Sequence, residues 1–450
     1  MTARLSEATL GRLPAWVVRP RPRAAPRAVH IGIGAFHRAQ LAPLFEDMDW
    51  GVIGASLRSA TVREAMAPQD FLYSLVIGES VRVIGAVRDV VRAEGLIEAL
   101  AAPATDIVTL TVTEKGYLPD PRRRGAADLV AAALRLRRER GLAPFTAISC
   151  DNLPGNGGRL RDAVLAASDP ETADWIAARG AFPQTMVDRI VPATEEADID
   201  ALAARIGLVD RAMVKAEPFW QWVIEDRFAG ARPDFASVGV RIAADIAPWE
   251  TAKLRLLNGA HSAIAYLGGL AGFDFVHEVI ARPAYARFIE ALWDESAATL
   301  VPPPGLDIAA YRRALIARFA NPGLAHRTRQ IAMDGSQKLP QRLLAPIADR
   351  LARGQGIGAL ALAVAGWMRW QSGRTDTGER FAVDDPLAGP IAARIAGLDD
   401  PRSQAEALVK FDAIFPPALA ADHRFTDAVA GKLAQLASHG ARATIEEFAR

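Results

Sequence analysis

The chain has 450 residues, half of them apolar, and its 53 basic and 52 acidic residues leave a net charge of +1. This length exceeds what one compact core holds, so we expect two domains. The balanced charge argues against a nucleic-acid partner, because such a partner requires a basic face that neutralises several phosphates.

The cysteine and histidine content bounds the chemistry further. A single cysteine, Cys150, excludes an internal disulfide, and the seven histidines show no spacing typical of metal ligands, so we expect no metal. The amino-terminal residues lack the charged start and apolar block of a secretory signal. The longest apolar run, residues 357–368, is too short to span a bilayer. These features predict a cytoplasmic protein with no membrane partner.

The first predicted element is an apolar strand over residues 28–33, which leads into a glycine turn and a helix. The turn reads G-I-G-A-F-H-R, from Gly32 to Arg38. Gly32 and Gly34 let the backbone approach a pyrophosphate, and the helix amino terminus beyond them supplies free N–H groups and a positive dipole. His37 stands where the third glycine of the usual fingerprint would be, so an ordinary tight turn is the alternative interpretation.

A second strand is predicted over residues 51–57, where a dinucleotide-binding fold has its ribose-reading acid. Ser56, Arg58 and Ser59 stand there instead. A cofactor that carries a 2′-phosphate therefore stays an alternative, because an arginine in this region can accommodate the phosphate.

Further strands are predicted at residues 106–112 and 145–149, with helical patterns at 60–66 and 95–101. Alternating strands and helices favour a parallel, doubly wound sheet with its ligand at the carboxyl ends of the strands. The sequence therefore predicts an α/β, Rossmann-like dinucleotide-binding domain over residues 1–245.

From residue 246 onward, strand patterns are scarce and helical periodicity prevails. The clearest helices are predicted at residues 254–270, 311–319, 357–370 and 427–436. We therefore expect an all-helical carboxyl-terminal domain over residues 246–450.

The stretch E-T-A-K-L-R-L-L-N-G-A-H, from Glu250 to His261, carries a carboxylate, an amine, an amide and an imidazole. At 100° per residue, Glu250, Lys253, Asn258 and His261 share an arc of roughly 140° on one helix. Partial burial of an amine among leucines makes it usable as an acid and base near neutrality. The alternative is a solvated helix face, with Glu250 and Lys253 as an ordinary i,i+3 pair.

Six sequence blocks, taken together, resemble the mannitol dehydrogenase family of polyol dehydrogenases and hexuronate reductases. The blocks cover residues 32–39, 111–117, 149–152, 186–192, 217–226 and 253–262. The most specific of them reads K-x-x-x-x-N-x-x-H. The resemblance implies a zinc-independent, nicotinamide-dependent alcohol–ketone oxidoreductase that acts as a monomer on a small sugar acid or polyol. It favours NAD as cofactor, with NADP as the alternative.

Within the family, residues 326–342 and 363–370 resemble the fructuronate reductase branch. The resemblance implies reduction of D-fructuronate to D-mannonate. The alternative is a mannitol or other polyol 2-dehydrogenase with the same catalytic helix. A catalytically silent sugar- or cofactor-binding sensor is a third class, but a sensor has no need of the intact lysine, asparagine and histidine set.

The resemblance also implies roles for individual residues. Lys253 would be the general acid in ketone reduction and the general base in alcohol oxidation. Asn258 and Asn152 would polarise the reacting oxygen. His261 would orient the substrate, and Glu250 would pass the proton between the lysine and solvent. Asn152 has an alternative role as a cap of the following turn.

Substrate and cofactor contacts follow from the same resemblance. Asp188 would be a further polar contact of the substrate, its alternative being an ion pair with Arg189 or Arg211. A hexuronate also needs a cationic partner for its carboxylate. The candidates for that partner are Lys338, Arg327 and Arg329. The candidates for the cofactor are Gly32, Gly34 and Phe36, with Arg38 as a phosphate contact.

Overall fold

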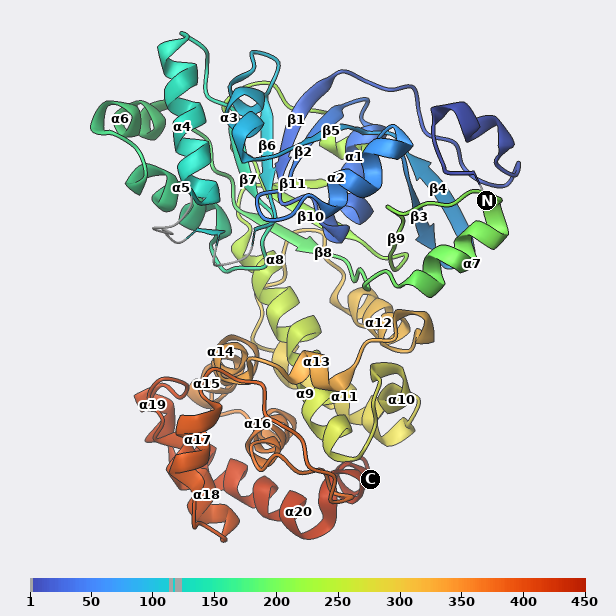
Figure 1. The fold of residues 1–450 in the computed structure, drawn as a ribbon. Coiled ribbons are helices and arrows are strands. Elements are labelled where there is room, and N and C mark those ends of the chain that lie inside the picture. The colour runs from blue at the N-terminus through green and yellow to red at the C-terminus, as the bar shows by residue number, and fades with distance from the viewer. Residues whose placement is uncertain (1–2, 113–115, 118–123) are drawn as a thin grey trace. The chain divides into compact units, whose positions relative to one another are not determined.

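The computed structural model describes residues 3–112, 116–117 and 124–450. The chain folds into two compact units, Met1–Ile246 and Ala247–Arg450. In Figure 1 the first unit runs from blue to green and the second from yellow-green to red. None of the helices in the described ranges is long and apolar enough to cross a membrane.

The first unit is built on a five-stranded sheet in which every neighbouring pair of strands is parallel. Its order is β5 (Val87–Val91), β2 (Gly51–Ala55), β1 (Pro26–Ile31), β6 (Ile107–Leu110) and β7 (Thr146–Ser149). Because both faces of such a sheet are covered, its strands are almost continuously apolar. The predicted Rossmann-like fold is confirmed, although the strands expected at residues 51–57 and 106–112 each end two residues earlier.

Alternate side chains of the strands enter two separate cores, one on each face of the sheet. On one face, Val29 and Ile31 of β1 pack with residues of α3 (Ala93–Ala101), α4 (Ala126–Glu139), α5 (Asn156–Ala166) and α6 (Pro170–Arg179). On the other face, Ala28 packs with residues of α1 (Ala42–Asp47) and with Trp222 and Phe235. Figure 1 shows α4 and α1 on opposite sides of the strands.

Two smaller sheets complete the first unit. Their orders are β11 (Arg241–Ala243), β10 (Gln221–Glu225), β8 (Thr185–Asp188), and β4 (Ser80–Ile84), β3 (Tyr73–Ile77), β9 (Val214–Lys215). The sequence analysis did not predict these strands, all of which are short; β9 and β8 pair with segments far away in the chain, whereas β3 and β4 form a local hairpin. The remaining helices of this unit are α2 (Thr61–Met66), α7 (Glu196–Ile206) and short turns at η1 (Glu7–Arg12), η2 (His37–Leu41), η3 (Ala67–Gln69) and η5 (Phe235–Val238).

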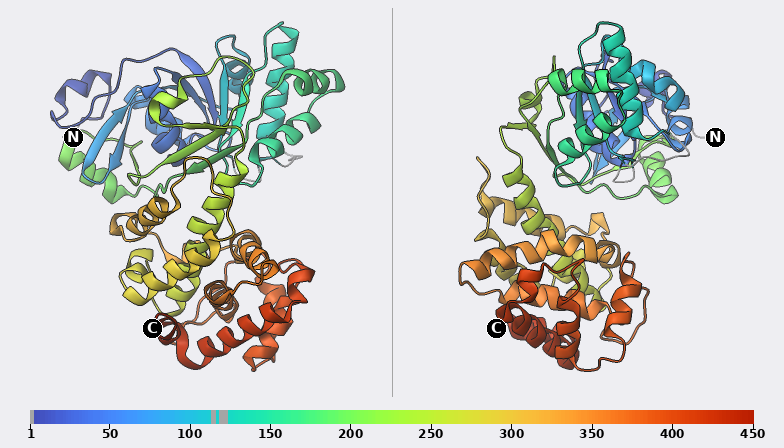
Figure 2. Two further views of the ribbon diagram at one scale, coloured as in Figure 1. Left: turned by 180° about the vertical axis from the view of Figure 1, so that it is seen from behind. Right: turned by 90° about the vertical axis from the view of Figure 1, so that its left-hand side faces the viewer.

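The second unit contains only helices and irregular segments, apart from two isolated bridges, which confirms the predicted helical domain. Figure 2 shows this unit from two further sides. Its core holds α9 (Gly259–Leu270), in which every residue is buried, and the almost wholly buried α16 (Gly358–Trp370). Around them lie α8 (Ala247–Ala252), η6 (Lys253–Asn258), α10 (Val276–Ile280), α11 (Pro283–Ala297), α12 (Ile308–Phe319), η7 (Pro322–Leu324), α13 (Thr328–Ala332), α14 (Gly335–Leu339), η8 (Pro340–Leu344), α15 (Ala345–Ala352), α17 (Ala388–Ile395), α18 (Pro401–Val409), α19 (Pro417–Ala420) and α20 (His423–Phe448).

The helix expected over residues 254–270 is longer and less regular than the sequence suggests. It runs without a break through α8, η6 and α9, and η6 is a π-helical segment. Its i→i+5 hydrogen bonds widen the turn, so a rotation of 100° per residue does not apply between Lys253 and Asn258. The calculated arc of the four polar residues is therefore wrong in its angles, although all four lie on one continuous helix.

Candidate active site

The glycine turn after β1 has the backbone that a dinucleotide requires. Gly32 has φ +94°, and a Cβ there would lie 2.2 Å from the carbonyl oxygen of Thr111, so only glycine fits. Its N–H donates to the carbonyl of Ala55 at 2.9 Å, which ties the turn to β2. Gly34, by contrast, is exposed, and a Cβ there would meet nothing closer than 3.8 Å. The open space over Gly34 fits the close approach of a pyrophosphate.

The helix beyond the turn begins at Ala35, and Phe36 lies partly buried in its first turn. The guanidinium of Arg38 contacts other parts of the protein. It donates to the carbonyls of Gly34 and Ala212 and lies 5.8 Å from the centre of the Tyr73 ring. Burial lowers the pKa of Arg38. The side chain therefore holds the glycine turn in place, a role that the sequence pattern did not indicate.

His37, at the position of the absent third glycine, is fully buried beneath the turn. Its ring stacks on that of His30 at 3.8 Å between centroids. His30 Nδ1 lies 2.7 Å from the Thr109 hydroxyl, whereas neither ring nitrogen of His37 has a hydrogen-bond partner among the described residues. Burial lowers the pKa of both histidines, to about 3 for His30. His37 thus packs inward against the sheet.

Beyond β2, the Ser56 hydroxyl donates to the carbonyl of Ser59 at 2.7 Å, and Arg58 is exposed. In this segment the sequence left undecided whether an arginine binds the 2′-phosphate of a cofactor. The block at residues 111–117 is described only in part, because residues 113–115 lie outside the described ranges.

The loop after β7 carries Asn152, which is exposed, while β8 ends at the buried Asp188. Asn156 joins the two segments: its amide donates to the carbonyls of Asp151 at 3.1 Å and Thr185 at 3.0 Å. Sequence reasoning missed Asn156, because its two partners are recognisable only once β7 and β8 are neighbours.

Both arginines proposed as ion-pair partners of Asp188 have other partners. Arg189 donates to the carbonyls of Glu217 and Ala39, and Arg211 pairs with Glu196. The assignment of Asp188 to the substrate, and its alternative as half of an ion pair with Arg189 or Arg211, both stay predictions.

In the second unit, Lys253, Asn258 and His261 are all buried, with exposed fractions of 9%, 7% and 8%. Glu250 lies one turn earlier on α8 and is partly exposed. Lys253 begins the π-helical segment and Asn258 ends it. Single π turns within α-helices are frequent at functional sites.

Two of these side chains carry buried polar atoms that the protein leaves unsatisfied. Asn258 Nδ2 and His261 Nε2 have no hydrogen-bond partner in the described part of the chain. Such atoms are rare in native proteins, because each costs about 1–3 kcal/mol unless something pairs with it. A donor amide and an imidazole nitrogen facing no protein partner are therefore what a hydroxyl- or carbonyl-bearing ligand requires.

His261 is held in its neutral form. Burial lowers its pKa well below the ordinary value, and the neighbouring His326, Arg318, Arg342 and Lys253 lower it further. Its ring packs between Phe319 and His326, at centroid distances of 4.7 and 5.2 Å. A neutral imidazole can donate or accept a hydrogen bond at its free nitrogen, depending on its tautomer.

The three cations expected to bind a carboxylate differ in burial and in partners. Lys338 is partly buried and donates to the carbonyls of Ile331 and Met333. Burial lowers its pKa. The two arginines are exposed.

Each of these exposed arginines has an aromatic partner. Arg327 lies 4.9 Å from the centre of the Phe275 ring. Arg329 pairs with Glu379 at 2.5 Å and lies 5.4 Å from the centre of the Phe381 ring.

Sequence reasoning also missed Arg342, four residues after Lys338. Its Nη1 donates to the Asn258 carbonyl at 3.5 Å and to the Ser262 hydroxyl at 3.2 Å. It belongs to the same sequence block as Lys338, but only the folded helices bring it to Asn258.

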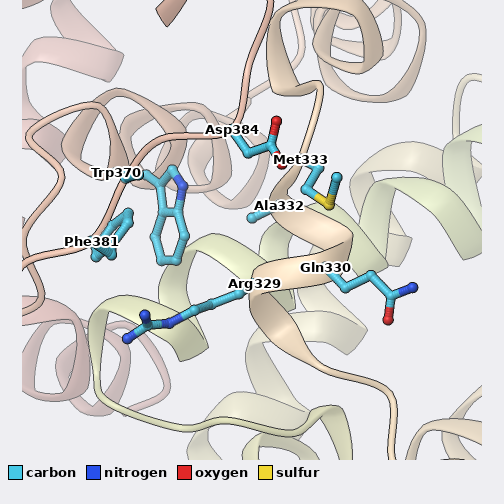
Figure 3. A pocket seen from close by; sticks show the side chains of 8 residues that line it. Arg329, Gln330, Ala332, Met333, Trp370, Phe381 and Asp384 are labelled. Carbon is cyan, nitrogen blue, oxygen red and sulfur yellow. The ribbon is translucent and has the colours of Figure 1, made fainter.

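A cavity of about 310 Å³ opens beside α13, as Figure 3 shows. Its lining consists of Arg329, Gln330, Ala332, Met333, Trp370, Phe381, Ala382 and Asp384. None of the buried lysine, asparagine and histidine set contributes to it. No group of three or more His, Cys, Asp or Glu residues in the described ranges could hold a metal ion.

A Rossmann domain followed by a helical domain with a buried lysine, asparagine and histidine defines a class, the NAD(P)-dependent oxidoreductases that act on CH–OH groups. Residues 26–237 match the mannitol dehydrogenase Rossmann domain, and residues 245–437 match the mannitol dehydrogenase C-terminal domain. The chain belongs to the mannitol dehydrogenase family.

Relatives of known name cover nearly the whole chain. The D-mannonate oxidoreductase of Escherichia coli (strain K12) is 41% identical over 95% of this chain and 97% of its own. The mannitol 2-dehydrogenase of Pyrenophora tritici-repentis is 38% identical over 94% of this chain and 81% of its own.

Two solved structures are similar to this chain over nearly its whole length. The Pseudomonas fluorescens mannitol 2-dehydrogenase ternary complex with NAD and D-mannitol matches with a TM-score of 0.86 and 33% identity, over 99% of each chain. A D-sorbitol dehydrogenase in substrate-free form matches with a TM-score of 0.89 and 31% identity, over 98% of this chain and 100% of that one.

Proposed function

We propose that the protein interconverts D-fructuronate and D-mannonate with NAD as cofactor. The observation that carries an enzymatic role is the pair of unsatisfied buried atoms, Asn258 Nδ2 and His261 Nε2, on the helix that also carries buried Lys253. The sugar-acid substrate is supported by the similarity to the Escherichia coli D-mannonate oxidoreductase and by the partly buried cation Lys338.

The catalytic helix supplies what ketone reduction requires. The nicotinamide, when bound, supplies the hydride that adds to the carbonyl carbon. The oxygen then takes up negative charge and a proton, which Lys253 donates. Asn258 Nδ2 donates a hydrogen bond to the same oxygen, and His261 orients a neighbouring hydroxyl. In alcohol oxidation, Lys253 accepts the proton that the hydroxyl loses.

Glu250 suits the exchange of that proton with solvent. It is partly exposed and stands three residues before the buried Lys253. In the first unit, Asn152 and Asp188 are proposed as further polar contacts of the substrate, on the family resemblance alone. Among the cations, Lys338 is the first choice for the carboxylate, with Arg327 and Arg329 behind it.

Gly32 and Gly34 provide the close backbone approach that the cofactor's pyrophosphate needs, and Phe36 lies in the first helical turn beyond. Arg38 would contact a phosphate only by giving up its present backbone partners. Arg58, exposed after β2, keeps NADP as the alternative cofactor.

A second candidate function, mannitol 2-dehydrogenase, is favoured by the Pseudomonas fluorescens structure of that name. Initial rates with D-mannonate and D-mannitol, each with NAD and with NADP, distinguish the two. We expect the highest kcat/KM for D-mannonate with NAD. A preference for D-mannitol would overturn the proposed substrate and leave the lysine mechanism in place.

The mechanism has its own test in Lys253→Ala. Because general acid–base catalysis contributes about 100- to 10,000-fold, kcat should fall by that factor while the unfolding temperature stays close to the wild-type value. Near-normal turnover by this variant would contradict the role of the lysine.

A further inference from the structure

Arg342 is a partly buried guanidinium with few partners. It lies in η8, and its two hydrogen bonds both start from Nη1, at 3.5 Å to the Asn258 carbonyl and 3.2 Å to the Ser262 hydroxyl. Guanidinium has five N–H donors and no acceptor, so most of its donor capacity is unused. Burial lowers the pKa of Arg342 to about 10.

Three other partly buried arginines of this chain, Arg255, Arg82 and Arg189, are better compensated. Arg255 pairs with Asp349 at 2.6 Å, and Arg82 pairs with Glu46 and Asp47. Arg189 makes three hydrogen bonds to backbone carbonyls, none longer than 3.1 Å. Among the described residues, no carboxylate lies within ion-pair distance of Arg342.

The surroundings of Arg342 concentrate positive charge next to the catalytic helix. Lys338 stands one helical turn earlier, and the charge of Arg342 contributes to lowering the pKa of Lys338. Arg342 also contacts the backbone of Asn258 and contributes to lowering the pKa of His261. An anion held here would therefore lie close to the amide and imidazole that face the substrate's oxygens.

We propose that Arg342, together with Lys338, binds the carboxylate of a sugar-acid substrate and determines the preference for such acids over neutral polyols. The proposal rests on the proposed function and deepens it. A carboxylate can accept two parallel hydrogen bonds from the unused edge of the guanidinium. A neutral polyol would leave the partly buried cation without a counter-charge, which is unfavourable.

A purely structural role for Arg342 makes a different prediction. If the side chain only holds the Asn258 carbonyl at the end of the π-helical segment, its loss should impair every substrate alike. A carboxylate-binding role should instead act mainly on KM, and only for acidic substrates.

The test compares Arg342→Gln and Arg342→Lys with the wild type in the presence of NAD. Arg353→Gln is the matched control, because Arg353 is exposed at the end of α15 and donates to the Ala298 carbonyl. We expect Arg342→Gln to lower the ratio of kcat/KM for D-mannonate to that for D-mannitol by about 30-fold or more, through KM. Arg342→Lys should recover part of the ratio, and the control should keep it.

Two further measurements keep the outcome unambiguous. Added guanidinium ion, at concentrations that do not unfold the protein, should restore D-mannonate turnover by Arg342→Gln. D-gluconate should inhibit the wild type competitively against whichever sugar it oxidises, and should inhibit Arg342→Gln much more weakly. Equal loss for both sugars, or unchanged inhibition by gluconate, would overturn the role of Arg342. If the wild type prefers D-mannitol, but D-gluconate inhibits it much more strongly than it inhibits Arg342→Gln, only the proposed function is refuted and the role of Arg342 stands.

Discussion

Asn258 and His261 illustrate a conflict between stability and ligand binding at single residues. Each has a buried polar atom that the described part of the protein leaves without a partner. Folding therefore bears a desolvation cost that a bound ligand can offset. The same atoms that favour a ligand should make the free protein less stable than it could be.

Asn258→Leu tests this conflict. Leucine branches at the same carbon as asparagine and has no polar atom to desolvate, so we expect the free energy of unfolding of the free protein to rise by about 1 kcal/mol. We expect kcat/KM to fall in the same variant. Urea unfolding without ligand measures the first effect and initial rates the second. A less stable variant would mean that the amide is satisfied in the native state.

Sequence spacing and the family resemblance together singled out Lys253, Asn258 and His261, which belong to one continuous helix. They were not sufficient for Arg342, whose contact with Asn258 spans 84 residues of chain. A pattern within one segment reports local geometry, whereas a contact between two helices depends on how they pack. The chemical roles assigned to these residues remain proposals.

At the scale of elements, the strand, turn and helix that contain Gly32 and Gly34 act as one unit. The two glycines differ in what surrounds them: Gly32 is enclosed by Thr111, whereas Gly34 faces open space. One glycine therefore serves the fold, and the other leaves room for a ligand.

Gly32→Ala and Gly34→Ala should separate these two requirements. The first places a Cβ 2.2 Å from the Thr111 carbonyl oxygen in a positive-φ conformation, so we expect a marked fall in unfolding temperature. The second should fold normally and bind NAD more weakly. Gly11→Ala is the control, since nothing lies within 4 Å of its added Cβ. Calorimetric titration with NAD and thermal unfolding provide the measurements, and normal NAD binding by Gly34→Ala would contradict the assignment.

The main strands and the long helices could be predicted from sequence because their apolar periodicity is strong. The two small sheets could not. The strand β9 has only two residues, Val214–Lys215, and it exists because β3 pairs with it across more than a hundred residues. A strand this short has no recognisable periodicity in its sequence. It forms because tertiary structure brings its pairing partner beside it.

At the scale of the whole molecule, buried histidines couple folding to pH. Burial lowers the pKa of His30, His37, His261 and His326 in the folded state. In the unfolded chain a histidine binds its proton near pH 6.5. Below that pH the unfolded state binds more protons than the folded state, so each such residue lowers stability as the pH falls toward its folded pKa.

His37→Phe isolates one of these contributions. Phenylalanine can keep the stacking on His30 and loses no hydrogen bond, since neither ring nitrogen of His37 has a partner in the described ranges. Relative to the wild type, we expect about 2 kcal/mol more stability at pH 5 than at pH 8. Urea unfolding at the two pH values measures this difference. His423→Gln, at an exposed histidine, should show no such dependence.

The π-helical segment between Lys253 and Asn258 makes the length of the catalytic helix as consequential as its composition. Deleting or adding one residue there would change the number of residues in this widened turn, and would therefore rotate everything downstream relative to Lys253. The amine of Lys253 would then change its position relative to the imidazole of His261, whose pKa it helps to lower. We therefore expect an insertion or deletion here to abolish activity even though every proposed catalytic side chain is kept.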